Sequence, residues 1–313
     1  MQKFNYVRHD KRETLISFLV RRFPYQNEER WLESIETGAI RLNGERVSPF
    51  RALKTRDIIS YCRPRSLEPE IDETYTILYK DESMLLVEKS GNIPISESGR
   101  YYQNTLLNLL REKEGFSELY AVHRLDKETS GILVIARSKH VATRFGEQFA
   151  RHEPEKLYTA VLIGEMPESE VLVDRPLRRA NQDESKVRIR QVVHDQGKPS
   201  RTLFSVERRA RGLTLARIQT FSGRTHQIRC HAEFIGFPIL GDKLYGQSDD
   251  RFLSFLKGES EPIFPPFGRV DHQLLHASSL SFLHPETGEK VTFTSDYRKE
   301  FLRYPGGREL LKR

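Results

Sequence analysis

Cysteine and long apolar segments are what this 313-residue sequence has least of. Its two cysteines, Cys62 and Cys230, are too few for a disulfide framework or a cysteine-rich zinc site. We therefore expect a reducing, cytoplasmic location. No window approaches the ~20 apolar residues of a membrane helix, and the first apolar stretch, residues 15–20, is too short for a signal-peptide core. No membrane association is expected, and no Walker or Rossmann phosphate loop is present.

Acidic residues are scarce in one part of the chain. Residues 1–65 hold 14 Lys and Arg against eight Asp and Glu, so +6 of the total net charge of +7 lies there. A basic N-terminal module beside a nearly neutral body is typical of a nucleic-acid-binding appendage, although a solvated charged surface gives the same pattern. The length allows one large domain and one small one.

The basic segment has a regular pattern of its own. Thr14 is placed to cap one helix, and a second helix is predicted from Asn27 to Gly38. The dipeptide at 43–44, Asn-Gly, predicts a hairpin between 39–42 and 45–47, and residues 57–61 predict a closing strand. The proline-rich and charged residues 63–73 predict a linker.

This order of elements resembles an S4 RNA-binding domain, a small α/β domain that would occupy residues 1–62. The S4 family usually has Arg-Leu-Asp at the start of its first helix and Gly-Asp before its last strand, where this chain has residues 13–15 and 56–57. Arg21, Arg22 and Arg41 are the candidate RNA contacts in this segment.

Residues 74–313 alternate strand-like and helix-like pieces without a βαβ rhythm. This pattern predicts an α+β domain with a mixed, largely antiparallel sheet. Strands are predicted near 83–87, 132–136, 157–163, 202–206 and 213–218, and helices near 105–110, 138–149 and 225–235. Residues 246–270, which contain Phe-Pro-Pro, predict a long surface loop or insertion.

Residues 123–131, His-Arg-Leu-Asp-Lys-Glu-Thr-Ser-Gly, carry the strongest functional signal. The apolar run 132–136 follows directly, so Asp126 is expected in a loop that enters a sheet, where catalytic groups are often held. An isolated loop aspartate is more commonly a turn or cap residue, because its side chain bonds nearby backbone N–H groups.

Two further clusters contain groups that bind bases and carboxylates. Lys156 and Tyr158 lie on one face of a predicted strand, where a tyrosine either stacks on a base or packs in the core. On the predicted helix 225–235, His226 and Arg229 share a face, and a guanidinium there could orient a carboxylate or form a surface ion pair. His226 and Cys230 lack a third ligand nearby, so no metal site is expected.

Together these motifs resemble those of the RluA-type RNA pseudouridine synthases. The matching stretches are H-R-L-D-x-x-T-S-G at 123–131, Lys-x-Tyr at 156–158, G-R-T-H-Q-I-R-x-H at 223–231 and G-x-P-I-x-G-D-x-x-Y-G at 236–246. The last of these is predicted to be structural, with Asp242 in a turn.

The resemblance implies roles for individual residues. Asp126 would be the essential aspartate, Tyr158 would stack on the target base, and Arg229 would pair with Asp126. Arg124 would hold the flipped nucleotide, and His123 and Arg224 are further candidate RNA contacts from the same motifs. No cofactor is implied, because the uracil itself is both leaving group and nucleophile.

The predicted function is therefore isomerisation of uridine to pseudouridine in RNA by a monomer, with ribosomal RNA as the first expected substrate and tRNA as the second. Asp126 would either attack C1′ or remove the C2′ proton, and the sequence does not choose between them. One alternative is a non-catalytic RNA-binding or ribosome-assembly protein that uses residues 1–65. Another is a glycoside hydrolase, which needs two carboxylates where the motif offers one.

Overall fold

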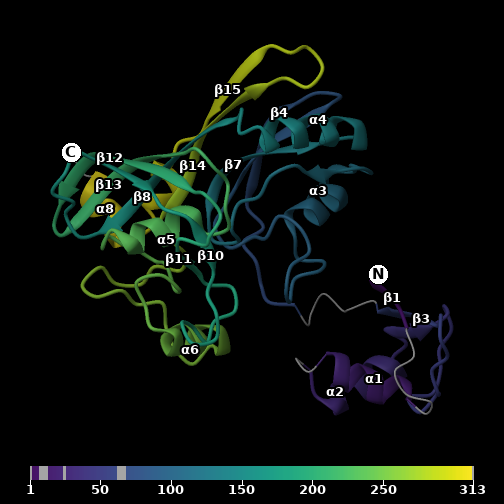
Figure 1. Cartoon of the computed structure of the whole chain (residues 1–313). Helices are drawn as coiled ribbons and strands as arrows, with labels where there is room; N and C mark the ends of the chain where they lie inside the picture. The colour runs from purple at the N-terminus through teal and green to yellow at the C-terminus, as the bar shows by residue number, and fades with distance from the viewer. Residues whose placement is uncertain (1, 7–12, 24–25, 62–67, 312–313) are drawn as a thin grey trace. The chain divides into compact units, whose positions relative to one another are not determined.

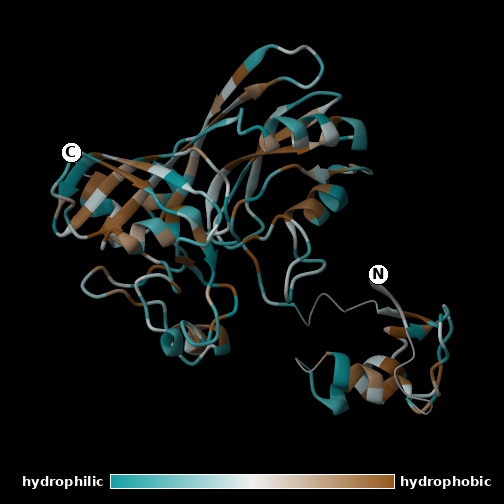
Figure 2. Ribbon diagram, viewed as in Figure 1, coloured by the Kyte–Doolittle hydropathy of each residue, from teal (hydrophilic) through white to brown (hydrophobic). Residues whose placement is uncertain are grey.

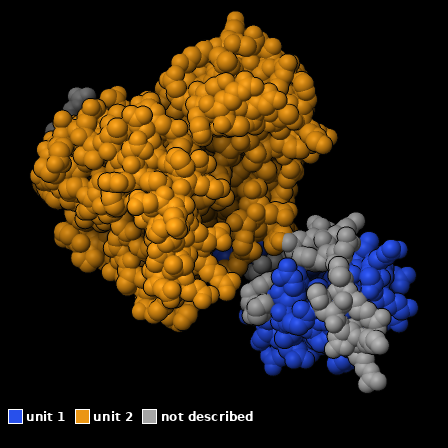
Figure 3. Space-filling view, viewed as in Figure 1, with its two compact units in different colours: residues 1–69 blue, residues 70–313 orange. Residues whose placement is uncertain are grey.

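The computed structural model describes residues 2–6, 13–23, 26–61 and 68–311. The chain divides into two compact units, residues 1–69 and 70–313 (Figures 1 and 3). The division falls within the predicted linker 63–73, of which residues 63–67 lie outside the described part. The predicted assignment of residues 1–62 and 74–313 to an S4-like domain and a catalytic domain stays a prediction.

The first unit combines two helices with a three-stranded antiparallel sheet in the order β1-β3-β2. Its elements are β1 (Gln2–Asn5), α1 (Leu15–Arg22), α2 (Glu28–Glu36), β2 (Ile40–Leu42) and β3 (Ile58–Tyr61). Thr14 caps the first helix with its side chain, as predicted, and Asn27, predicted as the start of the second helix, caps that helix in the same way. The unit has a core of its own in which Leu15, Trp31 and Ile59 are buried.

The predicted hairpin in this unit has its turn at 43–44, but residues 45–47 do not form its second strand. Leu42 and Glu45 exchange two backbone hydrogen bonds of 2.9 Å around a turn whose two residues, Asn43 and Gly44, have positive φ. The second arm ends at that single bridge, however, and β2 pairs with β3 instead. The reason is that Asn43 bonds to β3 through both its backbone and its side chain, which accepts from the N–H of Ile58.

A ten-stranded sheet organises the second unit, in the order β4-β5-β7-β14-β8-β13-β12-β9, with β15 on β14 and β6 on β7. The strands are β4 (Tyr75–Lys80), β5 (Met84–Lys89), β6 (Tyr120–Ala121), β7 (Ser130–Ala136), β8 (Glu155–Ile163), β9 (Glu170–Asp174), β12 (Arg201–Ala210), β13 (Leu213–Thr220), β14 (Leu275–Leu283) and β15 (Lys290–Thr294). A separate hairpin joins β10 (Leu177–Arg179) to β11 (Gln191–Val193). Among the described residues, β7 and β14 form the one parallel pair in a sheet that is otherwise antiparallel, which confirms the predicted α+β class.

Helices cover both faces of this sheet (Figure 1). They are α3 (Leu106–Glu114), α4 (Lys139–Ala150), α5 (Gln227–Phe234), α6 (Asp249–Lys257), α7 (Arg298–Phe301) and α8 (Pro305–Leu311). On β5 and β7, α3 packs on one face and α4 on the other, because successive residues of a buried strand point to opposite sides. On β8 and β13, α5 covers one face while α7 and α8 cover the other. Figure 2 shows apolar residues concentrated on the strands between these helices.

The prediction of a long surface loop over residues 246–270 is wrong in part, because α6 lies within it. Ser248 caps this helix, two aspartates occupy its first turn, and Gly258 ends it in the left-handed conformation. Phe252 anchors α6 on the structure beneath, with Tyr245 and Leu244 among its neighbours. Within the described residues, no helix is long and apolar enough to cross a membrane.

Candidate active site

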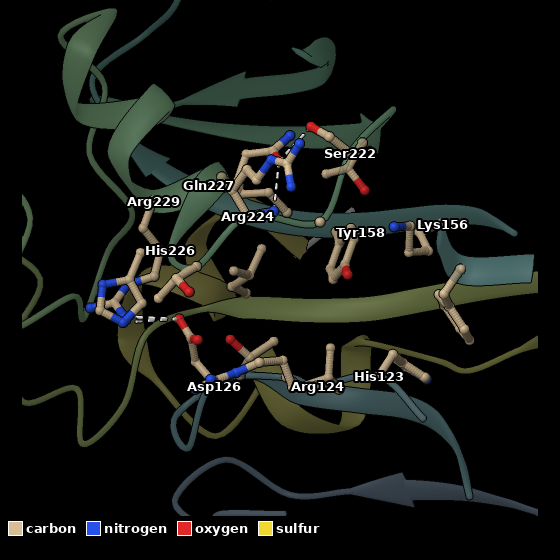
Figure 4. Close-up of a pocket in the computed structure, with 18 of the residues that line it drawn as sticks. His123, Arg124, Asp126, Lys156, Tyr158, Ser222, Arg224, His226, Gln227 and Arg229 are labelled. Atoms are coloured by element: carbon tan, nitrogen blue, oxygen red, sulfur yellow. Dashed lines mark hydrogen bonds and ion pairs between the residues drawn. The ribbon is translucent and has the colours of Figure 1, made fainter. Parts of the chain in front are cut away.

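A pocket of about 490 Å³ opens in the second unit beside the parallel pair β7 and β14 (Figure 4). It is lined by the loop before β7, by β8, by the connection from β13 to α5, and by α5 itself. Asp126, Arg124 and His123 lie along one side of it, and Tyr158 and Lys156 reach in from β8 (Figure 4). Asp126 is the one carboxylate among the described residues that line this pocket.

The loop that carries Asp126 is fixed at several points. Leu125 is buried in the core beneath α3, and the carbonyl of Asp126 accepts from the N–H of Thr129 to close a turn. The carbonyl of Lys127 accepts from both the N–H of Ile93 and the buried ammonium of Lys89, each at 3.1 Å. A carboxylate on a loop held this firmly would lose little conformational entropy when a ligand binds.

Gly131 explains why the motif ends in glycine. Its φ is +105°, and a Cβ there would collide with the backbone of Ala277 on β14. A glycine therefore lets β7 and β14 approach closely enough to pair, and that pairing sets the position of the loop immediately before β7.

Arg229 connects Asp126 to a second carboxylate. Its Nη1 donates to Asp126 Oδ2 at 2.9 Å, while Nε and Nη2 donate to the two oxygens of Asp242 at 2.6 and 2.9 Å. The Asp242 side chain is 0% exposed and also accepts from the N–H groups of Leu244 and Tyr245. The predicted turn role of Asp242 is present, but its ion pair with Arg229 was missed because nothing in the local pattern relates the two residues.

Arg229 keeps Asp126 ionised. Burial by itself would raise the pKa of Asp126, but the charges of a protonated His226 and of Arg229, and the hydrogen bond from Arg229, lower that pKa overall. His226 is itself neutral near pH 7, because burial and the neighbouring Arg229 lower its pKa to about 4. The Arg229 guanidinium is therefore the main cation that holds the carboxylate in its charged form, and the charge of Arg124 adds to it.

Tyr158 and Lys156 line the pocket from alternate positions of β8, as the period of two predicts. Burial raises the pKa of Tyr158, so its ring is the neutral phenol, and burial lowers the pKa of Lys156. The tyrosine offers an aromatic face on the side of the pocket opposite the Asp126 loop (Figure 4). Lys156 was not among the predicted site residues.

The other predicted pocket residues differ in character. Arg124 is exposed at the pocket, and Arg224 is half-buried, with its Nε donating to the carbonyl of Pro199. His123 accepts from the N–H of Val134 through Nε2 and stacks on Phe149 with ring centroids 4.8 Å apart. Burial lowers the pKa of His123 to about 3, so it forms part of the wall and carries no charge for a phosphate.

Three predicted contacts belong to the first unit and are exposed there. Arg21 pairs with the buried carboxylate of Glu13 at 2.8 Å, and the guanidinium of Arg22 lies over the ring of Phe23. Arg41 donates weakly to the carbonyl of Gly44, at 3.4 Å.

Two other chemistries find no support in this geometry. Among the described residues, no group of three His, Cys, Asp or Glu side chains is placed to hold a metal ion. The second carboxylate that a glycoside hydrolase needs is also missing from the lining, because Asp242 is fully buried and reaches Asp126 only through Arg229.

The family to which this chain is similar covers nearly all of the residues that line the pocket. The RNA pseudouridylate synthase family matches residues 75–234, which include Asp126, Tyr158 and Arg229. The ribosomal large subunit pseudouridine synthase D of Xanthomonas campestris is 30% identical over 86% of this chain and 81% of its own length. The ribosomal large subunit pseudouridine synthase C of Buchnera aphidicola is 31% identical over 86% and 85%.

A solved structure is similar as well. Human RNA pseudouridylate synthase domain containing 1 superposes with a TM-score of 0.56 at 27% identity, over 73% of this chain and 86% of its own. The family match, the two relatives and the shared fold lead to one conclusion. This chain belongs to the RNA pseudouridylate synthase family and is an isomerase that acts on RNA.

Proposed function

We propose that this protein converts uridine to pseudouridine in large-subunit ribosomal RNA, with Asp126 acting on the ribose. The reaction breaks the N1–C1′ bond, turns the uracil and rejoins it through C5, with release of the hydrogen on C5. The observation that carries the proposal is one ionised carboxylate, held by Arg229, in a pocket with the ring of Tyr158 on its other side.

The pocket suits a nucleotide that has left its stack. Its volume of about 490 Å³ lies within the roughly 300–1,000 Å³ typical of small-ligand sites. A flipped uracil would stack on Tyr158, and the exposed guanidinium of Arg124 would hold the flipped nucleotide. Arg224 and Lys156 would add positive charge along the path of the backbone.

Ribosomal RNA is proposed as the substrate because two similar proteins are named as ribosomal large subunit pseudouridine synthases. The test is to map pseudouridines in RNA from a deletion strain complemented with the parent protein or with Asp126→Asn. We expect specific ribosomal sites to be lost in the deletion strain and restored by the parent alone. Loss confined to tRNA would refute the substrate, and an unchanged map would refute the activity.

We also propose that the first unit is an S4-like RNA-binding domain of a monomeric, cytoplasmic enzyme. Its two capped helices pack on a small antiparallel sheet, and the segment 1–65 carries a net charge of +6. Arg22 and Arg41 are exposed on it, so both guanidinium groups can reach a phosphate.

Removing residues 1–69 is expected to weaken RNA binding and to flatten its salt dependence. Each lost phosphate contact should reduce the slope of log affinity against log salt by about 0.7–0.9. The measurement is RNA binding at several salt concentrations for the full chain and the truncated one. The full-length variant R22Q/R41Q is the matched control, since it removes charge and keeps the core. An unchanged slope in both would mean that this unit does not touch RNA.

Tyr158→Phe is expected to keep RNA affinity and turnover close to those of the parent, whereas Tyr158→Ala should lose both. The ring supplies the stacking surface, and base–aromatic stacking is worth about 1–3 kcal/mol per base. Competition binding and single-turnover assays of the two variants measure the difference. Equal losses in both variants would show that the hydroxyl of Tyr158, and not its ring, makes the contact that supports binding and turnover.

A further inference from the structure

His226 occupies an unusual position at the start of α5. Its φ is +53°, in the left-handed region that side chains other than glycine rarely adopt, and its side chain does not cap the helix. The side chain is 9% exposed and lines the pocket. In this conformation its two ring nitrogens face different groups: Nε2 lies 3.9 Å from Asp126 Oδ2, and Nδ1 lies 3.1 Å from the hydroxyl of Tyr245. Backbone strain of this kind is most common where a side chain must be aimed for function.

The bonding of Tyr245 decides which nitrogen of His226 carries the proton. The Tyr245 oxygen accepts from the backbone N–H of Gln191 at 2.9 Å, and a backbone N–H can only donate. Its own hydrogen is left for a second partner, and among the described residues the structure gives it one, His226 Nδ1. Nδ1 therefore accepts, and a neutral imidazole that accepts at Nδ1 carries its hydrogen on Nε2.

The ring of Tyr245 is held independently of its hydroxyl. The guanidinium groups of Arg229 and Arg190 lie 5.0 and 5.2 Å from its centroid, and the His226 ring meets its edge at 5.7 Å and 89°. Tyr245 is also 1% exposed. Replacing tyrosine by phenylalanine would thus remove the two hydrogen bonds of the hydroxyl, from Gln191 and to His226, and leave the packing of Arg229 in place.

The two oxygens of Asp126 are in different situations. Oδ2 accepts from Arg229 and faces His226 Nε2, while Oδ1 has no hydrogen bond from the described residues. Two donors on Oδ2 would fix the plane of the carboxylate. Oδ1 would then stay free to face the ribose of a bound nucleotide.

We propose that His226, as the neutral imidazole protonated on Nε2, is a second donor to Asp126 Oδ2, and that Tyr245 is the positioning residue that fixes this tautomer. The gap of 3.9 Å closes to a hydrogen bond when a nucleotide fills the pocket and excludes water. The inference rests on the proposed function and extends it: Asp126 acts through Oδ1, and a chain of hydrogen bonds from Gln191 through Tyr245 and His226 holds the other oxygen.

Tautomer and turnover are measured separately on the full-length protein. In the parent labelled with ¹⁵N-histidine, NMR should show the His226 proton on Nε2, and in Tyr245→Phe a substantial fraction should shift to Nδ1. With [5-³H]uridine-labelled RNA from the deletion strain, Tyr245→Phe should reduce kcat by about tenfold and leave KM within about twofold. A proton on Nδ1 in the parent, or an unchanged kcat in Tyr245→Phe, would overturn the proposal.

A matched pair at position 226 distinguishes the two nitrogens. His226→Gln extends an amide donor to the place of Nε2, whereas the amide of His226→Asn stops near Nδ1. Asparagine tolerates the φ of +53° better than glutamine does, so backbone strain alone would favour His226→Asn. We expect His226→Gln to be the more active, and Tyr245→Phe to add less than about twofold loss in that background, because the tautomer no longer matters. Equal activity of His226→Gln and His226→Asn would refute the donor role. So would a double variant His226→Gln/Tyr245→Phe whose loss of activity equals the product of the two single losses.

Failure of the proposed function would look different. A parent protein that releases no tritium from any RNA of the deletion strain overturns the pseudouridine assignment and the catalytic role of His226 with it. The tautomer of His226 would still be decided in that case, because the NMR measurement does not depend on activity.

Discussion

Asp126→Asn is expected to reduce pseudouridine formation by at least about 10³-fold while RNA affinity changes by no more than about threefold. An asparagine can still accept from Arg229 Nη1, so the loop and the pocket should keep their shape. It can neither attack C1′ nor take a proton from C2′, because its amide is a poor nucleophile and a poor base. Asp126 is also the one carboxylate in the described lining of the pocket, so no neighbour is placed to replace it.

The measurement is tritium release from [5-³H]uridine-labelled RNA under single-turnover conditions, with binding followed in parallel. Thermal unfolding of the variant controls for a general loss of structure. Asp242→Asn is the comparison for loss of a carboxylate outside the pocket lining, since Asp242 is buried behind Arg229. Activity of Asp126→Asn within about tenfold of the parent would remove Asp126 from the chemistry.

Arg229→Ala is expected to damage both turnover and stability. Turnover should fall about 10²-fold, because Asp126 loses the cation that keeps it ionised and oriented. Stability should fall by about 3–5 kcal/mol, because Asp242, at 0% exposure, would be left as an unpaired buried charge. The expected loss is greater than that of an exposed ion pair, which contributes at most about 1 kcal/mol.

The double variant R229A/D242N separates these two effects. Neutralising Asp242 removes the unpaired charge, so chemical denaturation should show most of the stability restored, while turnover should stay low. Recovery of turnover in the double variant would show that Arg229 only maintains the fold. A single variant as stable as the parent would show that the Asp242 pair contributes nothing. RNA affinity should change little in either variant, because the partners of Arg229 are carboxylates.

Local patterns predicted the elements of this protein well wherever the deciding interaction lies close in sequence. Thr14, Asn27, Thr105 and Ser138 each cap a helix through a backbone N–H three residues along the chain. The buried strand after the Asp126 loop needed only its unbroken apolar run. The helix α6 is not predicted although Ser248 and Gly258 mark its two ends, because the prolines that follow at 265–266 favour a loop.

The candidate site was predicted in part. Asp126, Tyr158 and Arg229 were chosen from separate motifs, and the structure brings them to one pocket. Lys156, Asp242 and Tyr245 are not assigned to the site from the sequence. Their neighbours in the site are distant in sequence and come next to them only when the chain folds. Their contributions become visible once the connection from β13 to α5 lies against the loop before β7.

The charge of the first unit, the caps and apolar runs of the elements, and the identity of the reactive groups can all be recognised from the residues alone. Each of these depends on the chemistry of a residue and its near neighbours. Three features appear only once the chain is folded: β7 runs parallel to β14, Arg229 bonds to two carboxylates, and the Tyr245 hydroxyl lies against Nδ1 of His226. These contacts join residues that lie 13 to 146 positions apart in the chain. The contact of His226 also depends on its left-handed backbone conformation. A one-dimensional pattern does not contain such distances, because they are set by how a whole sheet packs against its helices.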